Sequence, residues 1–202
     1  MSVYDITFSP TGGTKRVSDL FTDAFCGQGS HIDLTDRGMD FSALSFRQED
    51  ICIVAVPSYG GRVPAAAASR LARMKGNGAR AVLIVAYGNR AYEGTFAELQ
   101  DVLENAGFSC TAAPAVAEHS IMRQYAAGRP DAEDGKELAA FAASVRAKLD
   151  SPSRQTPPAL PGNRIRFSWF MCFWFVCIFF DIYTSFLLRT WGIYNTCNRN
   201  GV

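Results

Sequence analysis

Residues 9–14 could hold a phosphate group. They read Ser9-Pro10-Thr11-Gly12-Gly13-Thr14 and offer three hydroxyls. The two glycines let backbone N–H groups turn inward, and a helix that starts after them would point its positive dipole end at the same place. The loop is not a Walker A motif, because Lys15 is followed by Arg16, and it is not the G-x-G-x-x-G dinucleotide fingerprint. The alternative is a helix-capping turn without a ligand.

Two later segments combine aromatic rings with glycine. Residues 57–64 read Pro-Ser-Tyr-Gly-Gly-Arg-Val-Pro, and residues 87–93 read Tyr-Gly-Asn-Arg-Ala-Tyr-Glu. Tyr59 and either Tyr87 or Tyr92 could stack on the two faces of a flat aromatic ligand. The alternative is that these tyrosines only cover the edge of a sheet.

The elements that would position these segments alternate along the first 150 residues. Short apolar runs alternate with longer stretches of helical periodicity, which predicts a doubly wound α/β fold with a five-stranded parallel sheet. The runs ICIVAV and AVLIVA are apolar throughout, as expected for strands covered on both faces. Each chemical segment follows a strand, so the three should meet at the carboxyl edge of the sheet. The expected strands are Val3–Phe8, His31–Leu34, Ile51–Val56, Ala81–Ala86 and Ser109–Val116, and the expected helices are Lys15–Phe25, Pro64–Met74, Thr95–Ala106 and Asp134–Leu149.

Charge and composition exclude some classes of function. Residues 1–150 carry 15 Lys and Arg against 18 Asp and Glu, a net charge of −3, without a basic cluster that would indicate nucleic-acid binding. The N-terminus lacks the pattern of a secretory signal, so we expect a cytoplasmic domain. The six cysteines form no C-x-x-C pair, and the sequence gives little support for a metal site.

The three segments, in this order after successive strands, resemble the FMN-binding loops of flavodoxins. The resemblance covers residues 1–150 and is closest to the flavodoxin-like domains that precede a ferredoxin module in proteins of anaerobic bacteria. It implies FMN as the cofactor, with the phosphate bound by the first loop, the isoalloxazine lined by the second and the other wall completed by the third. The implied cofactor-binding residues are Ser9, Thr11, Gly12, Gly13 and Thr14, then Ser58, Tyr59, Gly60 and Gly61, then Tyr87, Gly88, Asn89 and Tyr92.

The function implied by this resemblance is electron transfer to or from a partner redox protein such as a ferredoxin or a reductase. No side chain is needed as acid or base, because the flavin carries the redox chemistry. An FMN-dependent NAD(P)H:quinone-type oxidoreductase and a flavodoxin-shaped module that has lost flavin stay as alternatives. Arg62 and Arg90 either attract an anionic partner at the rim of the site or are solvated loop charges.

The last 52 residues differ in composition. Residues 151–166 form a Pro-rich linker, residues 167–188 a hydrophobic segment whose single charge is Asp181, and residues 189–202 a short polar tail. The hydrophobic segment is long enough to span a bilayer and tether the domain to the cytoplasmic membrane. The competing explanation is a truncated or frame-shifted coding region in place of a ferredoxin module. Cys172, Cys177 and Cys197 lack the spacing of iron–sulfur ligands.

Overall fold

A computed structural model describes residues 1–88, 91–112, 115–117 and 127–150. The hypotheses about Asn89, Arg90 and residues 151–202 concern parts of the chain outside these ranges. Within them, no helix is long and apolar enough to cross a membrane.

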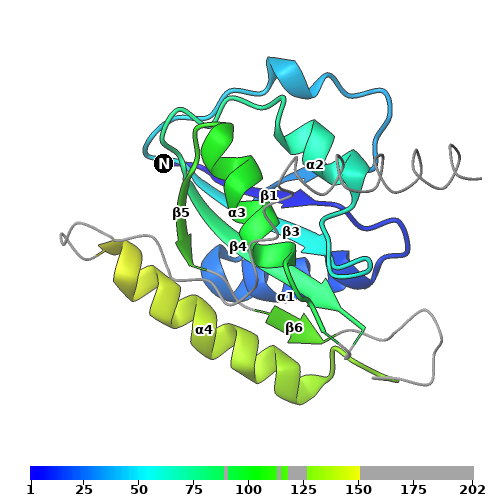
Figure 1. The fold of residues 1–202 in the computed structure, drawn as a ribbon. Coiled ribbons are helices and arrows are strands. Elements are labelled where there is room, and N and C mark those ends of the chain that lie inside the picture. The colour runs from blue at the N-terminus through cyan, green and yellow to red at the C-terminus, as the bar shows by residue number, and fades with distance from the viewer. Residues whose placement is uncertain (89–90, 113–114, 118–126, 151–202) are drawn as a thin grey trace, which may run out of the picture. The chain divides into compact units, whose positions relative to one another are not determined.

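The described residues form a parallel sheet covered by helices on both faces, as Figure 1 shows. The strand order is β2-β1-β3-β4-β5, and all described pairs are parallel. This order is that of a flavodoxin-like doubly wound fold, so the predicted fold class is confirmed. The elements are β1 (Val3–Thr7), α1 (Gly13–Cys26), β2 (Ser30–Asp33), the 3-10 turn η1 (Phe41–Ala43), β3 (Ile51–Pro57), α2 (Ala65–Leu71), β4 (Arg80–Tyr87), α3 (Thr95–Asn105), β5 (Ser109–Ala112), β6 (Ala115–Ala117) and α4 (Ala132–Asp150).

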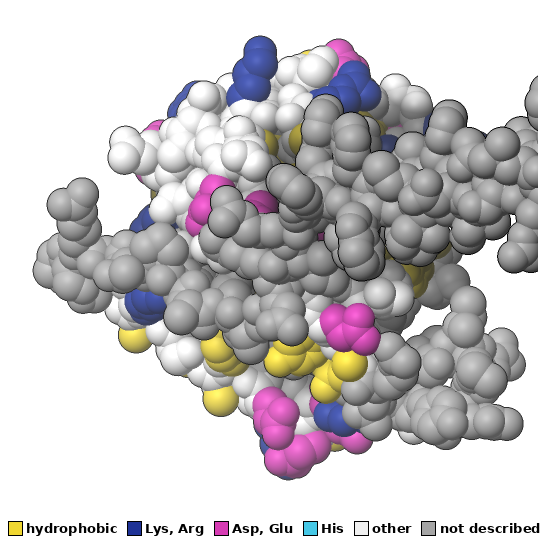
Figure 2. Space-filling model, viewed as in Figure 1, with side chains coloured by type: hydrophobic (Ala, Val, Ile, Leu, Met, Phe, Trp, Pro, Cys, Tyr) yellow, Lys and Arg dark blue, Asp and Glu magenta, His cyan; other side chains and the backbone are white. Residues whose placement is uncertain are grey.

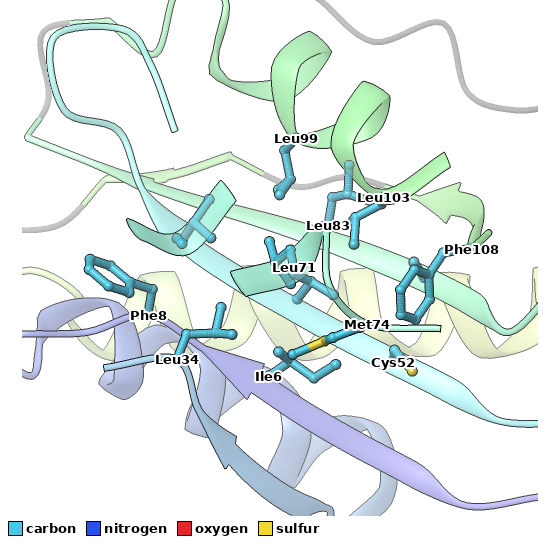
Figure 3. Close-up of a cluster of buried hydrophobic side chains, with 14 of the residues drawn as sticks. Ile6, Phe8, Leu34, Cys52, Leu71, Met74, Leu83, Leu99, Leu103 and Phe108 are labelled. Atoms are coloured by element: carbon cyan, nitrogen blue, oxygen red, sulfur yellow. The ribbon is translucent and has the colours of Figure 1, made fainter. Parts of the chain in front are cut away.

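The two central strands place alternate side chains in two separate cores. Cys52 and Val54 of β3 belong to the core that also contains Leu71 of α2 and Leu103 of α3, part of which is drawn in Figure 3. Ile51, Ile53 and Ala55 point the other way, into a second core with residues of α1 and α4. The unbroken apolar runs of the sequence follow from this burial on both faces.

The fifth strand position differs from the prediction. One strand was expected over Ser109–Val116, but two short strands, β5 and β6, both pair with β4. The register between β4 and β5 shifts between Ala81 and Val82. Such an irregularity interrupts a ladder without changing the strand order.

A buried carboxylate joins β1, α1 and β2 beneath the first loop. Asp5 is 4% exposed and accepts hydrogen bonds from Thr7 Oγ1 (2.7 Å) and Ser18 Oγ (2.5 Å). Its other oxygen lies 3.1 Å from Nδ1 of His31 on β2. Buried polar atoms need such partners, so this network fixes the start of α1 against the sheet.

Lys and Arg form no single patch on the visible, described part of one face of the protein. On the face shown in Figure 2, the visible Lys and Arg side chains are scattered among other types rather than gathered in one patch. Exclusion of nucleic-acid binding stays a prediction from the sequence.

The N-terminus of α4 is held by a reciprocal cap. Asp131 Oδ1 accepts from the N–H groups of Glu133 (2.9 Å) and Asp134 (3.0 Å), while Asp134 Oδ2 accepts from the N–H of Asp131 (2.8 Å). Asp134 also forms a two-pronged ion pair with Arg129, whose Nε lies 2.9 Å from Oδ2. The hydrogen bonds from Arg129 hold the pKa of the Asp134 carboxyl below its usual value.

This lowered pKa predicts an acid-sensitive contribution to stability. Asp134→Asn should unfold at lower urea than the wild type at pH 7, because the carboxylate has lost its charge. A carboxyl whose pKa is lower in the folded state stabilises fully above its unfolded pKa, and this contribution disappears as the pH falls through the folded pKa. The difference in unfolding free energy should therefore shrink below about pH 4. Glu133→Gln, at an exposed ion pair with Lys136, is the matched control. A difference that does not change with pH would contradict this account.

Candidate functional site

The first loop connects β1 to α1 at the carboxyl edge of the sheet. Its turn is closed by Gly12 N–H donating to the Ser9 carbonyl at 3.3 Å, and Gly12 has a φ of 88°. The Lys15 N–H donates to Ser9 Oγ at 2.9 Å, so the serine hydroxyl satisfies one of the first N–H groups of α1. A hydroxyl that accepts one bond can still donate its proton, so capping and ligand binding are compatible.

The start of α1 presents neutral donors rather than cations. The first N–H groups of a helix have no carbonyl partner within it, and here they belong to Gly13 and Thr14. Thr11 is exposed, whereas Thr14 is 2% exposed. The nearest cation, Lys15, pairs with Asp19, its Nζ lying 2.6 and 2.8 Å from the two carboxylate oxygens, and this hydrogen bonding raises the pKa of the Lys15 ammonium. The loop can thus hold an anion through hydroxyls and backbone N–H groups.

The second loop is a tight hairpin. The N–H of Tyr59 donates to the Arg62 carbonyl at 3.0 Å, and the N–H of Arg62 donates back to the Tyr59 carbonyl at 3.2 Å. Between them, Gly60 and Gly61 have φ values of 60° and 76°. Two consecutive positive φ angles are what a type I′ turn requires, which explains the Gly-Gly pair. Tyr59 is 52% exposed at the end of this hairpin, where a planar ligand could reach its ring.

The hairpin rests on the start of α3. Ser58 Oγ lies 2.8 Å from Thr95 Oγ1, a residue that is fully buried. The Arg62 guanidinium donates through Nε and a terminal nitrogen to the two carboxylate oxygens of Glu98, each at 2.7 Å. Arg62 is thus paired with Glu98, although its side chain stays 48% exposed, and both alternatives for its role stay predictions. The sequence analysis did not identify Thr95 or Glu98, since both look like ordinary residues of an amphipathic helix.

The third loop leaves less aromatic ring surface available for a ligand than the sequence predicts. The rings of Tyr87 and Tyr92 pack edge to face, with centroids 5.4 Å apart, and Tyr92 packs similarly against Phe96 at 5.3 Å. Tyr92 is partly buried against the core beneath α3. Part of the Tyr92 ring surface is thus already used in packing, while Tyr87 and Gly88 are half-buried at the end of β4.

Glu93 is a further neighbour of the hairpin that the sequence analysis missed as a site residue. It has a positive φ of 41° and lies against Gly61, where an added Cβ would come within 2.8 Å of the Glu93 Cβ. The second and third loops are therefore in contact. The first loop leaves β1, the neighbour of β3, so all three follow adjacent strands.

Comparison with solved structures supports the fold. A flavodoxin of Streptococcus pneumoniae is 22% identical, with a TM-score of 0.52 over 73% of this chain and 99% of that one. Flavodoxin 1 of Bacillus cereus is 18% identical, with a TM-score of 0.55 over 73% and 98%. The apo form of an NADH:FMN oxidoreductase is 16% identical, with a TM-score of 0.54 over 78% and 95%. No protein-family profile and no curated protein matches the sequence. At these identities the comparison shows a shared fold.

The two glycines of the hairpin predict unequal effects of substitution. Gly60→Ala should lower the unfolding free energy by about 1–2 kcal/mol, because a Cβ is disfavoured at positive φ while the space around it is open. Gly61→Ala should cost more, since its Cβ must also displace Glu93. Urea unfolding followed by circular dichroism measures both. Equal losses would show that the contact with Glu93 is not important for stability.

Proposed function

We propose that residues 1–150, with their flavodoxin-like fold, bind FMN non-covalently and carry electrons to or from a partner redox protein. One observation carries this proposal: a helix start with hydroxyls and backbone N–H donors and a hairpin with an exposed tyrosine follow adjacent strands β1 and β3. Sheets of this strand order bind their ligands at the carboxyl edge, and FMN at the point between β1 and β3.

The residues of the first loop fit the phosphate of FMN. Gly12 has a left-handed φ, and no atom lies within 4 Å of the position where its Cβ would be. An open cradle of this kind leaves room for a group that must approach the backbone closely. Ser9 and Thr11 would donate hydroxyls, and Gly13 and Thr14 would donate backbone N–H groups at the positive end of α1.

The other two loops fit the ring system. Tyr59 would stack on one face of the isoalloxazine, and Ser58, Gly60 and Gly61 would line its edge. Tyr87, Gly88 and Tyr92 would form the other wall, together with Asn89, and the packing of Tyr92 on Phe96 would hold that wall rigid. FMN supplies the electron chemistry when bound, and the protein supplies position and electrostatics.

Neutral phosphate donors have an electrostatic consequence. The dianionic phosphate would keep its charge, because Lys15 is engaged with Asp19 and Arg62 with Glu98. Because Lys15 and Arg62 are already paired, they offer a bound group little compensation for further negative charge. This supports an electron carrier of low potential.

A second candidate function is an FMN-dependent NAD(P)H oxidoreductase. The shared fold with an NADH:FMN oxidoreductase over 78% of this chain favours testing it. Steady-state oxidation of NADH or NADPH by the flavin-loaded protein, with and without a quinone, decides between this activity and electron carriage alone.

Binding of FMN is the first test of the proposal. The purified full chain, mixed with FMN, should quench flavin fluorescence and show a protein-bound visible spectrum. Thr11→Ala and Tyr59→Ala should each weaken binding by up to about tenfold, through loss of one hydrogen bond and of ring stacking respectively. Arg47→Ala is the control, because this exposed residue precedes β3 and so lies at the opposite edge of the sheet. If the chain is mixed with excess FMN and is colourless after the free FMN is removed, the proposal is disproved. The remaining alternative is then a flavodoxin-shaped module without flavin.

A further inference from the structure

The hairpin of residues 58–63 is attached to α3 at both of its ends. At one end, Ser58 Oγ contacts Thr95 Oγ1 at 2.8 Å. At the other end, Glu98 accepts three hydrogen bonds, two from the Arg62 guanidinium and one at 2.9 Å from the N–H of Val63. Both partners on α3 are one turn apart, so a single rigid element holds both ends of the loop.

The contact between Arg62 and Glu98 differs from an ordinary surface ion pair. The two parallel N–H···O bonds have the fork geometry that makes arginine–carboxylate pairs strong and directional. The Glu98 side chain is 24% exposed, and its carboxylate also fixes a backbone N–H of the loop. Hydrogen bonding by Arg62 keeps the pKa of Glu98 low, so the pair is ionised at neutral pH.

Between the two attached ends of the hairpin, Gly60 and Gly61 differ in their surroundings. Gly61 lies against Glu93 and is confined by it, whereas the space beside Gly60 is open. The Tyr59–Arg62 hydrogen-bond pair closes the turn around them. With both ends fixed and one glycine confined, the backbone at Gly60 is the part of the hairpin with room to change orientation.

We propose that Glu98 is a positioning residue that, through Arg62 and Val63, fixes the hairpin against α3 and thereby sets the potentials at which bound flavin accepts its first and second electrons. This inference rests on the proposed FMN site. Glu98 acts through Arg62 and the loop backbone, which would line the edge of the flavin in the proposed site. Arg62 therefore serves the geometry of the loop rather than recruitment of an anionic partner.

The proposal is first tested without flavin. Hydrogen–deuterium exchange of residues 58–63 in the apo full chain should rise about tenfold in Glu98→Gln and in Arg62→Lys, as expected when a charge-assisted bidentate contact is lost. Arg62→Lys keeps the charge but removes the fork. Asp40→Asn is the matched control, because it removes the carboxylate charge from an exposed ion pair. In this pair, Asp40 precedes η1 and Arg73 follows α2. Exchange unchanged from wild type in both site variants would overturn the proposal.

The second test uses the FMN-loaded full chain. Spectroscopic redox titration should show that the separation between the two one-electron potentials narrows in Glu98→Gln and in Arg62→Lys, while Asp40→Asn matches the wild type. A change in Glu98→Gln with no change in Arg62→Lys would overturn positioning, because charge alone would then be responsible. Unchanged potentials in both variants would overturn it as well. Failure of the wild type to bind FMN would instead disprove the proposed function, while the exchange experiment still tests the attachment of the hairpin.

Discussion

The burial of β3 and β4 on both faces is the constraint on which the rest of this structure depends. Every side chain of β3 is buried, and alternate residues contribute to two separate cores. Such a strand needs helices above and below it, and the connections between parallel strands then return through those helices. Each strand consequently ends at the same edge of the sheet. Three segments therefore meet at this edge: the hydroxyls of residues 9–14, the hairpin of residues 58–63 and the loop at Tyr92. The sheet topology alone places them there, so contacts between the segments are not needed to bring them together.

At this edge, three of the cations in the described part of the chain are paired with carboxylates. Lys15 contacts Asp19, Arg62 contacts Glu98 and Arg129 contacts Asp134. What remains for an anion is the weaker but directional set of hydroxyls and N–H groups at the start of α1. Hydrogen bonds from neutral donors depend strongly on distance and direction, so such a site would be specific for a ligand of matching shape. A free cation would attract any anion.

Sequence reasoning predicted the α/β class and the approximate positions of the first four strands, because these follow from local composition: apolar runs bounded by turn residues. It did not predict that Arg62 bonds to Glu98, because the two residues are 36 positions apart and each is ordinary in its own segment. It also treated Tyr87 and Tyr92 as interchangeable stacking partners. In the structure the two rings pack edge to face and Tyr92 also packs on Phe96, contacts that no local pattern encodes. The register shift between β4 and β5 is likewise a property of the assembled sheet.

The hairpin shows why these long-range contacts matter for function. The sequence alone reveals its Gly-Gly pair. That pair by itself would predict a loop in which the whole backbone is flexible. Attachment to α3 at Ser58 and Arg62 changes that expectation, since the loop can move only where it is not held. Glu93 then removes the freedom of Gly61 and leaves that of Gly60. Three contacts from elsewhere in the chain thus hold the hairpin, and open space remains beside Gly60. If the proposed ligand binds, such a loop could adjust its backbone at low cost, because the surrounding contacts would stay in place.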